Sequence, residues 1–484
     1  MQNLFAKLKG TEIHITSNSK EIKNGSVFVA KIGKNVDGHA FVKNALSLGA
    51  AVVLHSKPVE ESLKSDFPAA KFIQDENLEA NLPLVLKDFY DLPAKIVAIT
   101  GTNGKTSTAF IAASAFSLMG FKSGFIGTLG IFAFENGKAI GFKENPLTTP
   151  DNLTLFSTLN DFKKDGVEFV FFEASSIGIE QERIAGISLS ACCFTNFTQD
   201  HLDYHLTMEN YFNAKALLFS KFLPENGFAV LNKSSDKISK IEKICNDRSI
   251  KSITFNAENS SVFASNVRIF QDKIFFDCNL NSSLLKDCLV NLSGNFQLEN
   301  ILCVISLALG FGLNMKDFQN ILPLLKAPHG RLERIENANP SAPKIFLDYA
   351  HTPDSLKQVL QTLRDTLSGN GRLFLLFGCG GDRDKIKRPL MGGIATEIAD
   401  FTVITDDNPR NENPDEIRAQ IISGMKNSNF KEISGREEAI KFIISMAKQG
   451  DFILLAGKGH EDYQIIGDKK LPFNEEEIAK KYLI

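Results

Sequence analysis

The sequence predicts an α/β protein of three domains, and three observations lead to this prediction. At 484 residues the chain is too long for one hydrophobic core and should divide into about three domains. Apolar runs alternate with helical patterns from residue 93 to 327, which is typical of a doubly wound parallel sheet. After residue 328 further apolar runs each end in charged residues, as in an open Rossmann-like α/β domain. The predicted domains are therefore residues 1–92, 93–327 and 328–484.

The composition excludes several classes of protein. The net charge is −3, so no global positive field favours nucleic acid or an anionic membrane as a partner. The seven cysteines include no CxxC pair, and Cys192 and Cys193 lie in an apolar run, which favours buried thiols over metal ligands. No signal-peptide core and no apolar run of membrane-spanning length is present. We therefore expect a cytoplasmic protein with no membrane insertion.

Residues 1–92 predict a small α/β domain. Residues 26–30 and 50–54 are short apolar runs typical of strands, and residues 39–49 between them have helical spacing. A short helix is predicted over residues 84–90, with Pro83 at its start, where proline is tolerated. Residues after this helix form the expected linker into the second domain.

The second domain is organised around the segment KIVAITGTNGKTS. Residues 96–99 predict a buried strand, Gly101 and Gly104 permit a tight turn, and residues 105–107 begin a helix. A strand, a glycine turn and a Lys-Thr helix start form a P-loop, in which backbone N–H groups cradle phosphates and the threonine reaches magnesium. The usual pattern has glycine where this chain has Ile99, so the prediction depends on the strand–turn–helix context. The alternative is an ordinary strand-to-helix turn that contains a lysine.

Polar residues follow two further predicted strands of this domain. Residues 167–172 are apolar and end on Glu173, and residues 191–194 precede a polar cluster that includes His201. Because the carboxyl ends of parallel strands share the ligand-binding edge of a sheet, these side chains should lie beside the P-loop. Together with Thr106, they predict a Mg²⁺ site next to the phosphates. The alternative for the cluster is that it caps the next helix.

Three later segments of this domain carry weaker signals. Lys215 lies among apolar residues of a predicted helix, which alone is typical of a surface lysine whose stem covers apolar surface. Residues 233–290 are polar and hairpin-like and indicate no chemistry. The following helix begins with Asn295 and Asn300, which either contact a base or ribose or cap the helix.

The third domain repeats one pattern, a buried strand followed by a charged turn. The strands that begin at residues 372, 401 and 452 each deliver charged or polar side chains at their ends: Arg383, Asp407, Asn408, Arg410 and Glu461. An open α/β domain gathers such residues in one crevice. Because both signs of charge are present, the pattern favours a zwitterionic ligand over a polyanion.

Together these motifs resemble the Mur ligase family of peptidoglycan synthesis over nearly the whole chain. The resemblance is carried by TGTNGKTS, LTTPD, EASS, TNFTQDHLDYH, the Lys215 helix, HGRLERI, LDYAHTPDSL, GCGGDRD, DDNPR and GKGHEDYQ. It implies an N-terminal UDP-sugar-binding domain, a central ATP-binding domain and a C-terminal amino-acid-binding domain. The DNPR motif is similar to that of family members that add meso-diaminopimelate to UDP-N-acetylmuramoyl-L-alanyl-D-glutamate.

The resemblance also implies catalytic roles for Lys105, Glu173, His201 and Lys215. Thr106 and Glu173 would hold one Mg²⁺, and His201 and Lys215 a second. Lys215 would be carbamylated by CO₂ into an anionic ligand, because an unmodified ammonium would repel Mg²⁺.

Three substrate sites are implied in the same way. ATP would be bound by Gly101, Thr102, Asn103, Gly104, Lys105, Thr106, Ser107, Asn300, Arg331 and Asp348. The UDP-sugar dipeptide would be bound by Ser19, Thr148, Thr149, Ser175, Gln181 and Arg183. Diaminopimelate would be bound by Arg383, Asp407, Asn408, Arg410, Gly457 and Glu461. The planar fork of Arg410 suits a carboxylate, whereas the two acidic residues suit the distal ammonium.

The implied activity is that of an ADP-forming acid–amino-acid ligase of cell-wall biogenesis, and thus of cell shape and division. The D-glutamyl carboxylate would attack the γ-phosphate of ATP, and the diaminopimelate amine would convert the acyl phosphate into an amide. We expect a monomer that acts on small molecules only. Alternatives are the same ligation with L-lysine, a folate-type polyglutamate synthase, and a P-loop protein that hydrolyses ATP for conformational work.

Three positions depart from the usual pattern of the family. Residues 18–20 are Asn-Ser-Lys where Asp-Ser-Arg is usual, which weakens the contacts expected around Ser19. Ile177 stands where histidine is usual, so no role is assigned to it. Ser107 replaces a threonine, which is a mild change.

Overall fold

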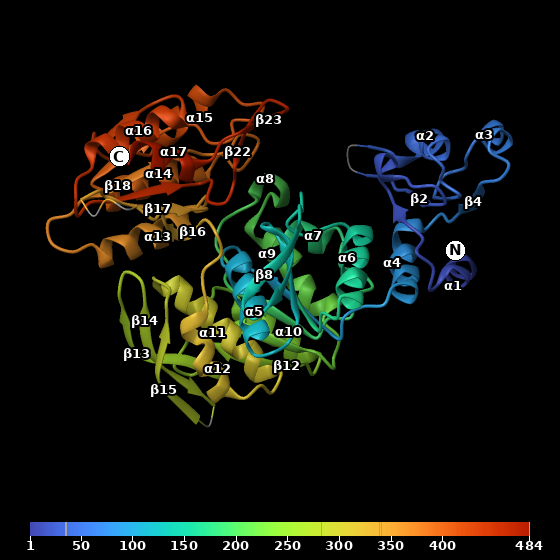
Figure 1. The fold of residues 1–484 in the computed structure, drawn as a ribbon, viewed down its shortest axis with the longest axis horizontal. Helices are drawn as coiled ribbons and strands as arrows, with labels where there is room; N and C mark the ends of the chain where they lie inside the picture. The colour runs from blue at the N-terminus through green and yellow to red at the C-terminus, as the bar shows by residue number, and fades with distance from the viewer. Residues whose placement is uncertain (34–35, 282, 338, 340, 484) are drawn as a thin grey trace.

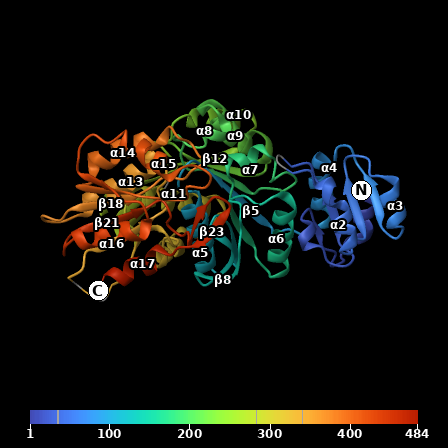
Figure 2. The ribbon, with the colours of Figure 1, turned by 90° about the horizontal axis from the view of Figure 1, so that it is seen from above.

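Three sheets, one after another along the chain, organise the computed structural model, which describes residues 1–33, 36–281, 283–337, 339 and 341–483. Figure 1 shows the N-terminal part in blue, the central part in cyan to yellow and the C-terminal part in orange to red. Figure 2 shows them in a row, with the central part in the middle. The predicted α/β architecture is confirmed.

The N-terminal part has a four-stranded parallel sheet of order β1-β2-β3-β4. Its elements are α1 (Gln2–Leu8), β1 (Ile15–Thr16), β2 (Val27–Ala30), α2 (Val42–Ser47), β3 (Val52–His55), α3 (Glu61–Asp66), β4 (Lys71–Gln74) and α4 (Leu78–Phe89). The predicted span of the last helix is wrong, because α4 already begins at Leu78 and contains Pro83 in its interior. Leu78, Leu82 and Leu86 recur every four residues and are all buried, so their packing outweighs the cost of the proline.

The central part has an eleven-stranded sheet of order β15-β14-β13-β12-β11-β10-β5-β9-β6-β7-β8. Its strands are β5 (Lys95–Thr100), β6 (Ser123–Gly127), β7 (Gly130–Glu135), β8 (Lys138–Lys143), β9 (Phe169–Glu173), β10 (Ala191–Phe194), β11 (Phe228–Asn232), β12 (Lys251–Phe255), β13 (Val262–Ile269), β14 (Ile274–Leu280) and β15 (Ser283–Val290). The strands from β12 to β6 in this order run parallel, and antiparallel hairpins extend the sheet at both ends. The edge strand β8 is exposed along its whole length.

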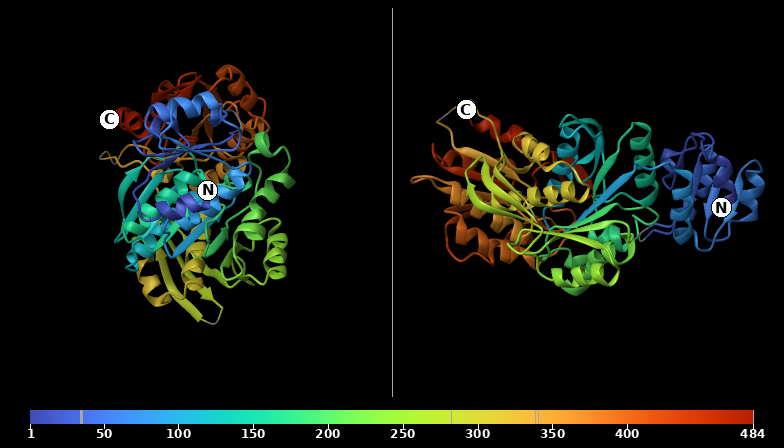
Figure 3. Two further views of the ribbon diagram at one scale, coloured as in Figure 1. Left: turned by 90° about the vertical axis from the view of Figure 1, so that its right-hand side faces the viewer. Right: turned by 90° about the horizontal axis from the view of Figure 1, so that it is seen from below.

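Helices cover both faces of this sheet (Figure 3). They are α5 (Lys105–Leu118), α6 (Asn152–Lys164), α7 (Ser176–Glu180), α8 (Leu202–His205), α9 (Met208–Leu217), α10 (Ile238–Asp247), α11 (Asn295–Gly310) and α12 (Met315–Ile321). Helices α6, α7, α9 and α10 contribute to the core on one face, and α5, α11 and α12 to the core on the other. Alternate residues of β5 enter the two cores, as a strand buried on both sides requires.

The hairpin-like prediction for residues 233–290 is correct only for its second half. Strands β13, β14 and β15 form antiparallel hairpins, but α10 and the parallel strand β12 precede them. The apolar stripe of α10 consists of Ile238, Ile241 and Cys245, which are buried at helical spacing among many polar residues.

The C-terminal part has a six-stranded sheet of order β16-β17-β21-β18-β19-β20, parallel except for β16. Its elements are β16 (Arg331–Arg334), β17 (Lys344–Asp348), α13 (Pro353–Thr366), β18 (Leu373–Phe377), α14 (Lys387–Ile398), β19 (Phe401–Ile404), α15 (Pro414–Ile422), β20 (Phe430–Glu432), α16 (Arg436–Met446), β21 (Phe452–Ala456), β22 (Tyr463–Ile466), β23 (Lys469–Pro472) and α17 (Glu475–Tyr482). Helices α13, α14 and α15 cover one face, and α16 and α17 the other. Among the described residues, no helix has both the length and the apolar character needed to cross a membrane.

Candidate active site

The predicted strand–turn–helix is present where β5 meets α5. Gly101 and Gly104 have φ angles of +153° and +83°, which glycine adopts without strain. A Cβ atom on Gly104 would lie 2.7 Å from Asn300 Oδ1, so the loop also packs too closely for a side chain there. Lys105 folds back over the loop, and its Nζ donates to the carbonyl oxygens of Gly101 (3.0 Å) and Thr102 (2.8 Å). This ammonium therefore lies where phosphates would meet the loop.

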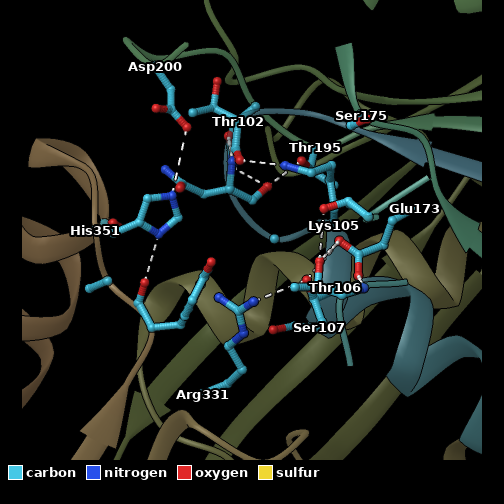
Figure 4. A pocket seen from close by; sticks show the side chains of 18 of the residues that line it. Thr102, Lys105, Thr106, Ser107, Glu173, Ser175, Thr195, Asp200, Arg331 and His351 are labelled. Atoms are coloured by element: carbon cyan, nitrogen blue, oxygen red, sulfur yellow. Dashed lines mark hydrogen bonds and ion pairs between the residues drawn. The ribbon is translucent and has the colours of Figure 1, made fainter. Parts of the chain in front are cut away.

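A cleft of about 370 Å³ lies over this loop, between the central and C-terminal sheets (Figure 4). It brings together many of the predicted site residues, namely Thr102, Asn103, Gly104, Lys105, Thr106, Ser107, Thr148, Glu173, Ser175, Arg183, His201, Asn300, Arg331, Asp348 and Arg383. Asn300 caps no helix, because α11 begins after Gly294, and its Oδ1 instead accepts from Thr108 Oγ1. The cleft thus joins residues that are far apart in the sequence.

Thr106, Glu173 and Arg331 form a polar cluster on the wall of this cleft (Figure 4). Thr106 Oγ1 donates to Glu173 Oε2 at 2.8 Å and accepts from Arg331 Nη2 at 3.1 Å. Glu173 is only 1% exposed, and its other oxygen accepts the backbone N–H of Thr128 at 2.7 Å. Hydroxyl and carboxylate oxygens held this way are the ligand types that Mg²⁺ prefers.

Lys215 is buried directly behind the loop, which excludes the surface role predicted from its helix alone. Its Nζ donates to the Gly101 carbonyl oxygen at 2.6 Å and lies 4.4 Å from the centre of the Tyr211 ring. Burial and the nearby Lys105 ammonium hold the pKa of Lys215 well below its ordinary value. The amine therefore loses its proton far more readily than that of an exposed lysine.

His201 enters the cleft from the turn before α8, with a left-handed φ of +54°. It does not cap α8 with its side chain, and Thr207 caps α9, so the capping alternative is wrong. Its Nε2 lies 3.4 Å from Asp200 Oδ2, and burial lowers the pKa of His201 to about 4. Across the cleft, His351 Nε2 lies 3.9 Å from the same oxygen, Asp200 Oδ2 (Figure 4).

Asp348 lies at the end of β17, and its side chain binds backbone N–H groups of two segments. Its two carboxylate oxygens accept the N–H groups of Leu332 (2.6 Å) and Ala350 (2.7 Å). Burial raises the pKa of this carboxyl to about 6. The side chain thus holds the start of β16 and the turn after β17, both of which border the cleft.

The residues predicted for the sugar dipeptide form two groups. Thr149 Oγ1 donates to the Glu173 carbonyl oxygen, and its own carbonyl accepts from Arg183 Nη1 at 2.8 Å. Arg183 is in turn fixed by Gln181 Oε1. Ser19, in contrast, is a buried residue of a short 3₁₀ turn in the N-terminal part and does not line the cleft.

A second cluster lies at the carboxyl edge of the C-terminal sheet. Asn408 Nδ2 donates to Glu461 Oε2 at 2.8 Å, and the Asn408 backbone N–H donates to Asp407 Oδ1. Arg410 has a φ of +51°, and its Nη1 donates to the Gly381 carbonyl oxygen. Gly457 packs against Asp407, because a Cβ there would lie 2.7 Å from Asp407 Oδ2. Thus Asp407, Asn408, Gly457 and Glu461 lie together, whereas Arg383 reaches into the nucleotide cleft.

Sequence reasoning missed several residues that hold these clusters. Asn196 Oδ1 accepts the N–H of Asn103, and Asp354 Oδ2 accepts from Asn103 Nδ2 at 2.9 Å. Lys458 is completely buried and donates to Asn408 Oδ1 at 3.1 Å. The only sequence signal for Asp354 was the Thr-Pro-Asp-Ser start of α13. For Lys458 it was the lysine inside GKGHE.

Comparisons with known proteins cover all three parts of the chain. Family models match residues 12–90 (Mur ligase family, catalytic domain), 99–308 (Mur ligase middle domain) and 330–459 (Mur ligase, glutamate ligase domain). A relative from Rickettsia montanensis, named UDP-N-acetylmuramoyl-L-alanyl-D-glutamate–2,6-diaminopimelate ligase, is 41% identical over 98% of this chain and 96% of its own.

Solved structures show the same likeness. One described as UDP-N-acetylmuramoyl-L-alanyl-D-glutamate–2,6-diaminopimelate ligase is 30% identical, with a TM-score of 0.65, and covers 97% of this chain and 94% of its own. The MurF ligase from Thermotoga maritima in complex with ADP has a TM-score of 0.68 at 19% identity, covering 100% and 98% of the two chains. At that identity the second likeness concerns the fold alone.

Proposed function

The chain belongs to the Mur ligase family, and we propose that it is an ADP-forming ligase that adds meso-diaminopimelate to UDP-N-acetylmuramoyl-L-alanyl-D-glutamate in cell-wall synthesis. The observation that carries this proposal is the shared cleft, in which the P-loop of the central sheet faces Arg331, Asp348 and Arg383 of the C-terminal part. A ligase needs this arrangement, because a phosphate donor and an amine donor must reach the same carboxylate. A relative of 41% identity with that printed name supports the choice of substrates.

ATP binds with its phosphates on the loop from Gly101 to Thr106, under the ammonium of Lys105. We assign the remaining loop contacts to Thr102, Asn103, Gly104 and Ser107. Asn300 and Asp348 line the same cleft, and we assign them to the nucleoside. Arg331 reaches the same site from the C-terminal part, since its Nη2 already contacts Thr106. Lys105 and Arg331 would neutralise charge on the transferred phosphoryl group.

Mg²⁺ fits the oxygen-rich side of this cleft, and neutralisation of phosphate charge is the chemistry it would supply there. Thr106 and Glu173 would hold one ion, since their oxygens lie 2.8 Å apart and open onto the loop. His201 and a carbamylated Lys215 would hold a second. The depressed pKa of Lys215 favours the neutral amine, which is the form that reacts with CO₂.

The other two substrates occupy the flanks of the cleft. We assign the UDP end of the sugar nucleotide to the N-terminal domain, residues 1–92, at Ser19, and the dipeptide to Thr148, Thr149, Ser175, Gln181 and Arg183 of the central domain, residues 93–327. The C-terminal domain, residues 328–484, takes diaminopimelate through Arg383, Asp407, Asn408, Arg410, Gly457 and Glu461. The carboxylate of the ligand suits the guanidinium of Arg410, and its distal ammonium suits Asp407 and Glu461.

The reaction proceeds in two steps. The D-glutamyl carboxylate takes the γ-phosphoryl group of ATP, which gives an acyl phosphate and ADP. The amine of diaminopimelate then attacks the acyl carbon, and phosphate leaves. Because water would hydrolyse the acyl phosphate, closure of the C-terminal part over the loop both brings the amine and excludes solvent. We propose that the enzyme acts as a cytoplasmic monomer.

An assay of ADP release with defined co-substrates tests this function. We expect release only when ATP, the UDP-sugar dipeptide and meso-diaminopimelate are all present, with L-lysine a poor replacement because Arg410 then lacks a carboxylate partner. Faster turnover with L-lysine would refute the amino-acid assignment. ADP release without any amino acid would refute the ligase in favour of an ATP-driven switch, and release with a folate would refute the sugar nucleotide.

A further inference from the structure

Lys458 is a completely buried cation that the proposed reaction does not use. It lies in the loop after β21, next to Gly457, and its side chain is 0% exposed. Its Nζ donates to Asn408 Oδ1 at 3.1 Å and to Glu461 Oε2 at 3.2 Å. A buried ammonium is costly unless its partners are fixed, so this one is built into the cluster.

The contacts around Lys458 leave the Asn408 amide one orientation. Asn408 Oδ1 accepts from Lys458 and from the backbone N–H of Ile465 (2.9 Å), so the amide nitrogen must face Glu461. Glu461 Oε2 then accepts from both Asn408 and Lys458. Among the described residues, Glu461 Oε1 has no hydrogen-bond partner. One carboxylate oxygen is thus anchored, and the other is left for a ligand.

The positive charge of Lys458 also favours the charged forms of two neighbouring carboxylates, because it lowers the pKa of both Asp407 and Glu461. Asp407 and Glu461 repel each other, and burial together with Asp407 raises the pKa of Glu461. Although burial alone would raise the pKa of Asp407, Lys458 and Arg436 lower it overall. Two carboxylates this close tend to share a proton unless a cation compensates them.

We propose that Lys458 is a positioning residue for the amino-acid substrate: its ammonium fixes the Asn408 amide and the Glu461 carboxylate so that Glu461 and Asp407 can receive the substrate's distal ammonium. Lys458 acts through Glu461 and does not touch the ligand. This inference rests on the proposed function, because it assigns the cluster to an amino acid with a side-chain ammonium. The competing explanation is that Lys458 only stabilises the fold.

A double-mutant cycle on the full-length enzyme separates the two explanations. Lys458→Met should raise the KM for meso-diaminopimelate at least tenfold and leave the KM values for ATP and for the UDP-sugar dipeptide within twofold. Lys458→Gln keeps a hydrogen-bond donor but not the charge. Its KM for meso-diaminopimelate should lie between those of the wild type and Lys458→Met. In a Glu461→Gln background, where the carboxylate is already lost, Lys458→Met should change the KM for meso-diaminopimelate less than threefold.

Arg364→Met is the matched control, because it removes an ion pair (with Asp400, 2.9 Å) from the same part of the chain, away from both clusters. Thermal unfolding of every variant reports stability separately. Equal increases in all three KM values, additive effects in the cycle, or a fall in Tm with unchanged KM would overturn the proposal. If the wild type uses L-lysine instead, the proposed substrate is wrong, but the same cycle is measured with L-lysine, which also carries a side-chain ammonium.

Discussion

Burial changes the chemistry of single side chains around the loop between β5 and α5. Lys215 has 1% exposure and a backbone carbonyl as its nearest partner, whereas a lysine elsewhere on the same helical segment, Lys221, pairs with Glu182 in solvent. Lys221 is therefore an ordinary surface cation, whereas the buried amine of Lys215 loses its proton more readily. A depressed pKa beside a phosphate-binding loop makes Lys215 a candidate for a chemical role.

Replacement of Lys215 tests that role directly. Lys215→Ala should lose nearly all ADP release, because a proposed metal ligand is removed, and added short-chain carboxylates should restore part of it. Lys221→Ala is the control from the same segment and should stay within twofold of wild type. Near-normal turnover by Lys215→Ala, with the fold intact by circular dichroism, would contradict the carbamate.

The stability of the protein should depend on His460 below neutral pH. Burial, Arg331 and His329 lower the pKa of His460 to about 3, against 6.5 in the unfolded chain. Between these pH values His460 binds a proton in the unfolded state but not in the folded state. Its contribution to the free energy of unfolding is therefore fully present above pH 6.5 and is lost as the pH falls below it. From pH 7 to pH 5, His460→Gln should lose about 2 kcal/mol less unfolding free energy than wild type. Denaturant titrations at both pH values measure the difference, and equal losses would contradict the assignment.

At the scale of elements, the loop between β5 and α5 is built from two constraints that act together. Its backbone enters the left-handed region at Gly104, and its turn is packed against Asn300 of α11. The helix start then presents free N–H groups to the cleft, where an anion is favoured. The shape of the loop and the dipole at the start of α5 thus depend on the same short segment.

Gly104→Ala should separate the packing of the loop from its backbone strain. The new Cβ would meet Asn300 Oδ1 at 2.7 Å, so the KM for ATP should rise at least tenfold. Gly120→Ala, at the other end of α5, is the control, because it has a φ of +92° but nothing within 4 Å of the added atom. Both variants carry left-handed strain of about 1 kcal/mol. An equal effect of the two on ATP binding would mean that strain alone matters.

At the scale of the whole molecule, polar contacts join the C-terminal part to the central part. Asn103 donates to Asp354 at the start of α13, and Gln199 donates to Asp384 at 3.3 Å. The N-terminal part contacts the central part through stacking of Tyr90 on Phe156, with ring centres 6.3 Å apart, and through an ion pair between Lys31 and Asp151 at 3.9 Å.

Asp354→Ala should loosen the C-terminal part without unfolding it. We expect faster limited proteolysis between residues 325 and 330 in the absence of nucleotide, and a higher KM for ATP. Lys470→Ala is the control: it also removes a contact between these parts, but its partner Glu144 is 3.4 Å away and both side chains are exposed. Identical cleavage rates for the two variants would contradict a special role for Asp354.

How far the sequence predicts this protein depends on how local each feature is. The strand, the glycine turn and the helix start around Gly101 were predicted correctly, because they lie within thirteen consecutive residues. The start of α4 was missed because the packing of Leu78 outweighs the signal of Pro83. Lys458 and Asp354 were missed because their partners lie 50 and 251 residues away, and only the folded chain reveals those distances. The roles of the site residues stay predictions until the variants are measured.

The two outer strands of the central sheet, β8 and β15, bear on how readily the protein aggregates through its sheet edges. An uncovered strand offers free backbone groups to any other chain. Here β8 carries lysines at both ends, Lys138 and Lys143, and β15 is bent in its middle, where Asp287 has a φ of +56°. The register of both outer pairs is interrupted by irregularities, which twist the edges away from flat pairing. These features protect the two edges of a wide sheet against edge-to-edge aggregation.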